Sequence, residues 1–356
     1  MEKFGLKKSH FIIAFSSVIF IWAVGNIVSI LNFKVLFTHA DWKLTQFHVN
    51  YFDYGFIRRG FIGTLFYPLF SQIINNINLQ KIIIFWKETF LYFLYASGII
   101  IFFIRKTENL TLKARLFFIS SFILSPCGLI EAAYDIGRYD HFNFILFGLS
   151  IYLIYLNKVN INSILLVFAA LIHEGSIFYI HPLIFGLNYS RQNSRFFKAL
   201  KVILPSIIIA IVIFLLGDKP INLPPNISLG DIWGSGLHPI FATNQSSKDI
   251  IIFSIYLFLS LTLIFGFYIS NRIKFDFLFL SCLTPIVLFV IAADWGRWLH
   301  YIAINVFIVL AIKINNLEKV NIPNYFLLAM FLFGLPLGPI GIGGALPYID
   351  LILNKF

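Results

Sequence analysis

The sequence predicts an all-α fold, a bundle of helices that crosses a membrane several times. Its 356 residues are 59% hydrophobic and only 12% charged, and the mean hydropathy is +0.86, which excludes a soluble globular protein. The long continuous apolar runs favour helices over the alternating strands of a membrane barrel. We therefore expect one polytopic membrane domain over residues 1–356, with about ten or eleven membrane segments.

Charge and cysteine content narrow the choice of partners. The net charge of +11 requires no nucleic-acid partner, because lysine and arginine collect in cytoplasmic loops facing anionic lipid. Cys127 and Cys282 both lie in apolar runs, which argues against a disulfide scaffold and against a zinc site. The sequence points to no cofactor and to no set of metal ligands, and it leaves open whether the protein needs a metal ion.

The N-terminal elements set the predicted topology. Three lysines precede the first apolar run, 11–33, so the N-terminus is expected in the cytoplasm. No cleavage site follows this run, and it should remain as the first span. Residues 34–60 then form the first outer loop. The next run, 61–74, is shorter than the roughly 20 residues that a span needs, and we interpret it as a re-entrant or interfacial helix.

The later elements follow from the same charge rule. The run 164–187 is interrupted at His173–Ser176, and one uninterrupted crossing would place basic residues outside, so we predict a helix broken there. Residues 218–249, rich in proline, glycine and aromatic residues, are predicted to form a large ordered outer loop. The remaining apolar runs that we interpret as spans are 82–104, 116–133, 144–156, 199–216, 250–270, 277–293, 302–312 and 322–335.

A short charged motif occurs twice between apolar runs. Residues 135–141 read DIGRYDH and residues 294–300 read DWGRWLH, which we call the first copy and the second copy. An acid, a glycine, an arginine, an aromatic residue and a histidine keep the same order, at an offset of 159 residues. Where charge is this scarce, the coincidence indicates function. The alternative is an Asp–Arg clasp that pins two helix ends at the membrane surface.

The predicted topology places the unusual polar clusters on the outer side, where they would face one cavity. Ionisable groups near hydrocarbon are expensive and are candidates for function. The candidate catalytic residues are Glu174, His173, Asp53, Asp135, Asp140 and Asp294, and the candidate substrate-binding residues are Arg138, Arg297, Arg58, Arg59, His141, His300, Trp298 and His238.

Structural interpretations of these residues remain open beside the functional ones. Arg58 and Arg59 would serve as lipid headgroup contacts, His181 and His238 as buried structural histidines, and Tyr139 and Trp298 as interfacial anchors. Lys87 and Glu88, inside a predicted span, would pair with partners across the bundle.

The combination of arginines and carboxylates suits one kind of chemistry. Arginine binds phosphate oxygens through two parallel hydrogen bonds, and a nearby acid or histidine can accept a proton from an attacking hydroxyl. That favours group transfer from a lipid-linked phosphate donor. Glu174 is the first choice as base, because low dielectric raises the pKa of a carboxyl group and a neighbouring arginine lowers it. Asp135, Asp140 and Asp294 lie beside arginines and are expected to orient them.

The stretch from Arg138 to Ser176 resembles the EpsG-like, Wzy-type polysaccharide repeat-unit polymerases. An arginine precedes one span, a short basic loop follows, and the next span ends in small residues, a histidine and another small residue. The stretch spans 39 of the 356 residues. In it Arg138 corresponds to the arginine of the family and His173 to the histidine.

The resemblance implies a glycosyltransferase of the GT-C superclass in the bacterial inner membrane. Such an enzyme would join undecaprenyl-pyrophosphate-linked oligosaccharides into capsule, O-antigen or exopolysaccharide at the outer face. Its partners would be the lipid-linked oligosaccharide, membrane lipids, and flippase and chain-length regulator proteins. The alternatives are a GT-C transferase that adds one sugar from a polyprenyl-monophosphate donor, with Asp53 as base, and a transporter or flippase of an anionic lipid-linked substrate.

The predicted topology can be tested by labelling single cysteines with an impermeant reagent, in a background that lacks Cys127 and Cys282. A cysteine at position 193 should stay unlabelled from outside, and labelling there would contradict the broken-helix interpretation. The segments expected in the cytoplasm are 105–115, 188–198, 271–275 and 313–320, and those expected outside are 40–60, 134–142, 218–249 and 294–300.

Overall fold

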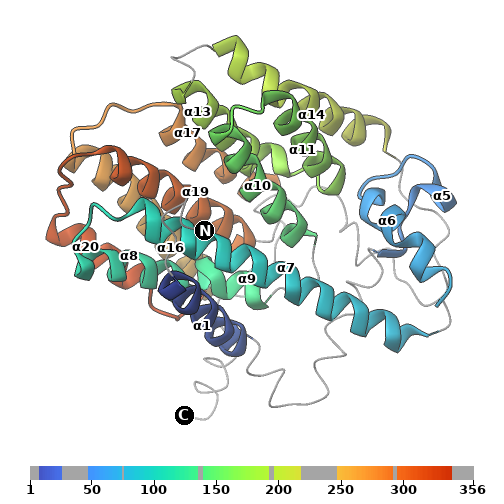
Figure 1. Ribbon diagram of the computed structural model, residues 1–356, viewed down its shortest axis with the longest axis horizontal. Coiled ribbons are helices and arrows are strands. Elements are labelled where there is room, and N and C mark those ends of the chain that lie inside the picture. The colour runs from blue at the N-terminus through green and yellow to red at the C-terminus, as the bar shows by residue number, and fades with distance from the viewer. Residues whose placement is uncertain are drawn as a thin grey trace. The chain divides into compact units, whose positions relative to one another are not determined.

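A computed structural model of the chain (Figure 1) confirms the all-α fold class. Helices and turns make up the part of the chain that it describes, and no β-strand occurs there. The described residues are 8–25, 47–73, 76–134, 139–191, 196–217, 247–291 and 295–338.

Four helices within these residues are long and apolar enough to cross a membrane, and a bent pair of helices would make a fifth. This agrees with a multi-pass membrane protein. Six further apolar helices have only 10–17 residues, so the expected ten or eleven membrane segments would need these short helices to enter the membrane as well. The four long spans are α7 (Ile77–Lys106), α14 (Phe196–Leu216), residues Ile250–Ser270 of α16 (Ser247–Ser270), and α19 (Trp295–Asn316).

The bent pair departs from the straight span expected over 116–133. Helix α8 (Leu112–Leu124) meets the segment Pro126–Tyr134 at 41°. Gly128 has φ −98° and ψ −133° at this break, and a Cβ there would overlap the carbonyl oxygen of Phe122. Only glycine permits so close a backbone approach. The bend therefore arises from Pro126 and Gly128, two helix-breaking residues within an otherwise apolar run.

The chain divides into two compact units, which we describe separately. Unit 1 comprises Met1–Val28, Phe93–Asp135 and His238–Phe356, and unit 2 comprises Ser29–Tyr92 and Ile136–Leu237. Helix α7 contributes to both, since the division falls between Tyr92 and Phe93.

Unit 1 is built around α19. In the most apolar 18-residue stretch of this helix, 89% is buried inside the protein. The Phe307 ring packs against Phe118 and Phe122 of α8 at centroid distances of 4.9 and 5.0 Å, and against Phe333 at 5.5 Å. These aromatic contacts join three helices around one ring. The other helices described in this unit are α1 (Lys8–Gly25), η2 (Pro126–Ile130), α9 (Glu131–Tyr134), α17 (Phe277–Leu283), η4 (Thr284–Val287), α18 (Leu288–Ile291) and α20 (Asn324–Phe333).

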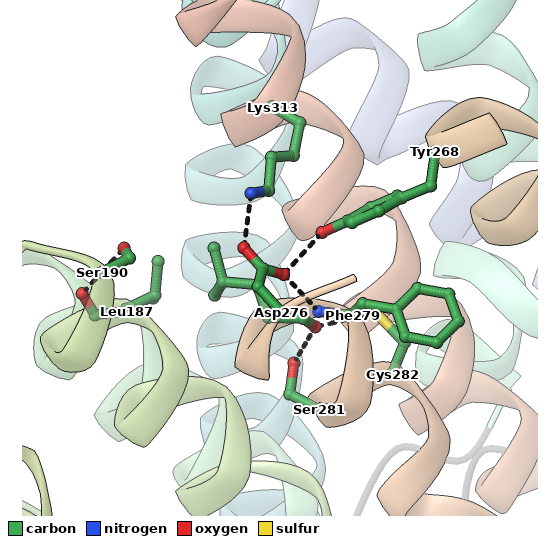
Figure 2. A network of polar contacts seen from close by, with 9 residues as sticks. Leu187, Ser190, Tyr268, Asp276, Phe279, Ser281, Cys282 and Lys313 are labelled. Carbon is green, nitrogen blue, oxygen red and sulfur yellow. Dashed lines mark hydrogen bonds and ion pairs between the residues drawn. The ribbon is translucent and has the colours of Figure 1, made fainter. Parts of the chain in front are cut away.

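One carboxylate ties three helices of unit 1 together at their ends (Figure 2). Asp276 accepts hydrogen bonds from the Phe279 amide and from the Tyr268 hydroxyl, each at 3.0 Å, and it caps the N-terminus of α17. The ammonium group of Lys313 lies 2.6 Å from its second oxygen. Helices α16, α17 and α19 are therefore joined at one acid.

Unit 2 places α10 (Asp140–Tyr155), α11 (Val159–Ile172) and α14 side by side, as Figure 1 shows in green. The chain leaves the helical conformation at His173 (φ −154°, ψ 114°) and resumes in α12 (Ser176–Tyr179) and α13 (His181–Arg191). The predicted break at His173–Ser176 is confirmed.

The prediction that the run 61–74 is too short for a span is also confirmed. It forms α6 (Gly60–Phe70), an 11-residue helix of about 16 Å. A Cβ on Gly63 would overlap the carbonyl oxygen of Val49, so α6 lies directly against the extended residues that precede α5 (Tyr51–Tyr54). Gly63 therefore fixes the position of the segment that carries Asp53.

We expect Gly63→Ala to destabilise unit 2, because the added methyl group must push the Val49 backbone away, and such overpacking costs about 1–3 kcal/mol. Gly98→Ala in α7 is the matched control, since no atom lies within 4 Å of its Cβ position. Thermal unfolding in detergent should show a lower midpoint for the first variant only. Equal midpoints would contradict the close approach of α6.

Candidate active site

Two charged side chains from distant parts of unit 2 meet at the break in the α11 segment. The Arg59 guanidinium lies 3.4 Å from Oε1 of Glu174, with side chains 24% and 20% exposed. Arg59 precedes α6 with a left-handed backbone (φ 58°), and Glu174 lies in the turn between α11 and α12. The pair is thus held by two irregular backbone segments and stays open to solvent.

The charge state of Glu174 bears on its expected role as base. Burial alone would raise the pKa of Glu174, but the Arg59 guanidinium, with a smaller contribution from His173, more than offsets this and brings the pKa to about 2. A carboxylate held ionised so firmly accepts a proton poorly near neutral pH. The geometry suits Glu174 better as the residue that orients Arg59.

His173 is buried beside this pair, and its tautomer follows from one contact. The Gly175 amide donates to Nδ1 of His173 at 3.0 Å, so the proton of the neutral ring lies on Nε2. In this tautomer His173 donates a hydrogen bond and does not accept a proton.

Tyr139 of the first copy lies close enough to this pair for the charge of Arg59 to act on it. Tyr139 is 2% exposed, and its ring packs edge-on against Phe47 at 5.4 Å, which excludes the interfacial-anchor interpretation. Burial raises the pKa of Tyr139. Of the charges that act on its phenol group, Arg59 lowers the pKa and Glu88 raises it. Asp140 begins α10 and is also buried. Asp135 and Arg138 lie outside the described residues.

The histidine of the first copy is part of a buried charged cluster. Nδ1 of His141 lies 3.3 Å from Glu88, and the other Glu88 oxygen lies 2.8 Å from the Lys87 ammonium. The expected pairing of Glu88 across the bundle is confirmed.

Sequence analysis missed how enclosed Lys87 is. Its ammonium lies 3.9, 4.3 and 4.4 Å from the ring centroids of Phe47, Phe66 and Phe142. The aromatic faces replace water around the cation. In the sequence, the signal that could have indicated this cluster was an adjacent Lys–Glu pair in an apolar run.

Arg58 has a different environment from Arg59. It donates to the carbonyl oxygen of Phe214 at 2.7 Å, in the last turn of α14, and its guanidinium lies 4.8 Å from the Phe214 ring centroid. Cationic groups at helix C-termini satisfy carbonyls that lack a partner in the helix. The structure therefore gives Arg58 a role in fixing α14.

Asp53 lies exposed on α5. Its carboxylate accepts from Nδ2 of Asn50 at 2.8 Å and is hydrogen-bonded to Tyr67. Asn50 in turn accepts from the Asp53 amide at 2.9 Å. The acid of the first outer loop is therefore positioned by its neighbours while remaining accessible.

The second copy belongs to unit 1, and the burial of its C-terminal half excludes the interfacial-anchor interpretation of Trp298. Trp298 and His300 are 3% and 1% exposed, because α19 begins at Trp295 and carries them into the core. His300 bonds the Cys127 carbonyl through Nδ1 at 2.9 Å, and the Arg297 guanidinium lies 4.5 Å from the Trp298 ring centroid.

The convergence of both copies on one cavity remains a prediction. Asp294 and His238 lie outside the described residues, and the two copies belong to different units. Among the described residues, no three His, Cys, Asp or Glu side chains come together in a way that could hold a metal ion. The other histidine expected to be structural, His181, is buried and bonds the Ser176 carbonyl at 2.9 Å, which confirms that interpretation.

No family model, no curated protein and no solved structure matches this chain.

The Arg59–Glu174 pair predicts a pH-dependent contribution to stability. Because the pKa of Glu174 is lowered from 4.5 to about 2 on folding, the contribution is complete above about pH 4.5 and is lost as pH falls toward 2. Glu174→Gln should therefore lower the unfolding midpoint at pH 7, and the difference from the natural protein should shrink between pH 4.5 and 3. A difference that is constant with pH would contradict the ion pair.

Proposed function

We propose that this chain is a membrane glycosyltransferase that joins lipid-pyrophosphate-linked oligosaccharide repeat units into a surface polysaccharide. The observation that carries the proposal is the solvent-accessible Arg59–Glu174 pair at a helix break, with His173 beside it. The proposal includes a GT-C-like arrangement in a bacterial inner membrane, with the N-terminus in the cytoplasm and the site at the outer face.

The chemistry of the pair supports an anionic leaving group. Glu174 accepts a hydrogen bond from Nη2 of Arg59 at 3.4 Å and so orients the guanidinium, whose planar set of N–H donors matches the oxygens of a phosphate. When the bond between sugar carbon and phosphate oxygen breaks, these donors stabilise the charge that develops on the phosphate.

A specific observation also favours the second candidate, a transferase that uses a polyprenyl-monophosphate donor. Asp53 is exposed, oriented by Asn50, and six residues before Arg59 in the same segment. A carboxylate in that position can accept the proton of an attacking hydroxyl while Arg59 binds the donor phosphate. The two candidates share the anion site and differ in the length of the product.

The role of Arg59 can be tested in cells that make the polysaccharide. Arg59→Lys keeps the positive charge but loses the planar pair of donors, so polymer should fall at least about tenfold, the value of one lost charge-assisted contact. Arg58→Lys is the matched control, because lysine can still donate to the Phe214 carbonyl at the end of α14.

Lipid-linked single repeat units should accumulate in the Arg59→Lys cells, with normal amounts of the protein in the membrane. Normal polymer in those cells would contradict the anion site. Transfer of a single sugar by the natural protein would identify the second candidate, and movement of the lipid-linked unit across the membrane without a new glycosidic bond would identify a transporter.

A further inference from the structure

His48 is a titratable side chain that the proposed chemistry has not yet used. It lies three residues before α5 begins and five residues before Asp53, and it is partly buried. Its ring is in contact with α6 through Phe70, at a centroid distance of 5.9 Å, and with α7 through Gln80.

The Gln80 contacts determine which ring nitrogen of His48 carries the proton. Nε2 of Gln80 donates to the carbonyl oxygen of Ile73 at 3.0 Å, and a carbonyl only accepts, so the amide nitrogen must face that way. The oxygen of the Gln80 amide then faces Nε2 of His48, also at 3.0 Å. Because that oxygen also only accepts, Nε2 of His48 must donate.

The remaining nitrogen, Nδ1, therefore carries the lone pair. Gln80 is itself fully buried, so the anchor that fixes this tautomer is protected from water. Burial lowers the pKa of His48 below its usual 6.5, while Gln80 and the charge of Asp53 oppose this, and the ring is neutral at pH 7. A neutral imidazole with an oriented lone pair is the form that accepts a proton.

One asparagine connects His48 to the nearby acid. Nδ2 of Asn50 donates both to the backbone carbonyl of His48, at 2.9 Å, and to the carboxylate of Asp53, at 2.8 Å. Asn50 is 2% exposed, so this junction is shielded from water. Among the described residues, Asp53 is the charged group that acts on the ring, and its negative field stabilises the imidazolium that forms once the proton is taken.

We propose that His48 is the general base of the transfer reaction, with Gln80 fixing its tautomer and Asp53 stabilising its charged form. This rests on the proposed function. The acceptor hydroxyl gives its proton to Nδ1 of His48 as its oxygen bonds to the sugar carbon. The bond from that carbon to the lipid phosphate breaks, the phosphate leaves with the electron pair, and the imidazolium later returns the proton to water.

The experiment measures glycosidic bond formation by the purified full-length protein in vesicles. The probe is the lipid-pyrophosphate-linked oligosaccharide that accumulates in cells from which this protein has been deleted. His48→Ala should lower the rate by about 100-fold or more, the usual contribution of a general base. A rate within about threefold of the natural protein, at equal protein levels, would overturn the proposal.

Two variants separate catalysis from folding through the pH profile. Gln80→Glu puts a carboxylate on Nε2–H, which favours the imidazolium, raises the pKa of His48 and should move the acidic limb of the profile to higher pH. Asp53→Asn removes a negative charge and should move the same limb to lower pH, with a reduced rate. If His48 has only a structural role, the acidic limb of the pH profile stays in place in both variants. That result would overturn the assignment.

The outcomes also distinguish a failure of the role assigned to His48 from a failure of the proposed glycosyltransferase function. If the natural protein forms no glycosidic bond from the probe, both fail. If it forms product and Asp53→Asn abolishes the reaction while His48→Ala spares it, Asp53 is the base and only the role of His48 is overturned.

Discussion

A charge among apolar side chains must be paired, and this constraint shapes both units of the protein. Glu88 is fully buried, yet it lies between the Lys87 ammonium and the His141 ring. Asp276 is bound by Lys313 and by two neutral donors. His141 joins α10 to α7 at Glu88, and Asp276 joins α16, α17 and α19, so the pairing of charge also determines which helices pack together. Removal of one partner would leave an uncompensated charge, which costs more than the pair contributes.

The Arg59–Glu174 pair differs from the Glu88 cluster because both of its side chains are partly exposed, whereas Glu88 and His141 are buried. Both of its residues come from irregular backbone, one from a left-handed position and one from a turn. Such segments hold side chains firmly while leaving room beside them, and binding sites concentrate there. The contrast with the enclosed Lys87 cluster separates a pair that can meet a substrate from a pair that holds helices together.

Sequence patterns predicted the features that depend on local composition. The all-α class, the shortness of 61–74 and the break at His173 follow from apolar length and from helix-breaking residues. The environments of single residues did not follow, because they depend on partners far away in the chain. Arg58 and Arg59 are adjacent, yet one bonds the end of α14 and the other bonds Glu174. His48 gave no signal in the sequence, since its tautomer depends on a glutamine 32 residues away.

The enclosure of α19 has a consequence for how the protein is made. A helix whose apolar stretch is 89% buried presents little surface to lipid. It also carries polar groups such as Asn305, which donates to the Ser281 carbonyl. Lipid offers no partner for that amide, whereas the neighbouring helix does. It would therefore be unfavourable for α19 to pass from the insertion machinery into lipid without a neighbouring helix. We expect its membrane insertion to depend on helices synthesised earlier, which would give the biogenesis of unit 1 a fixed order.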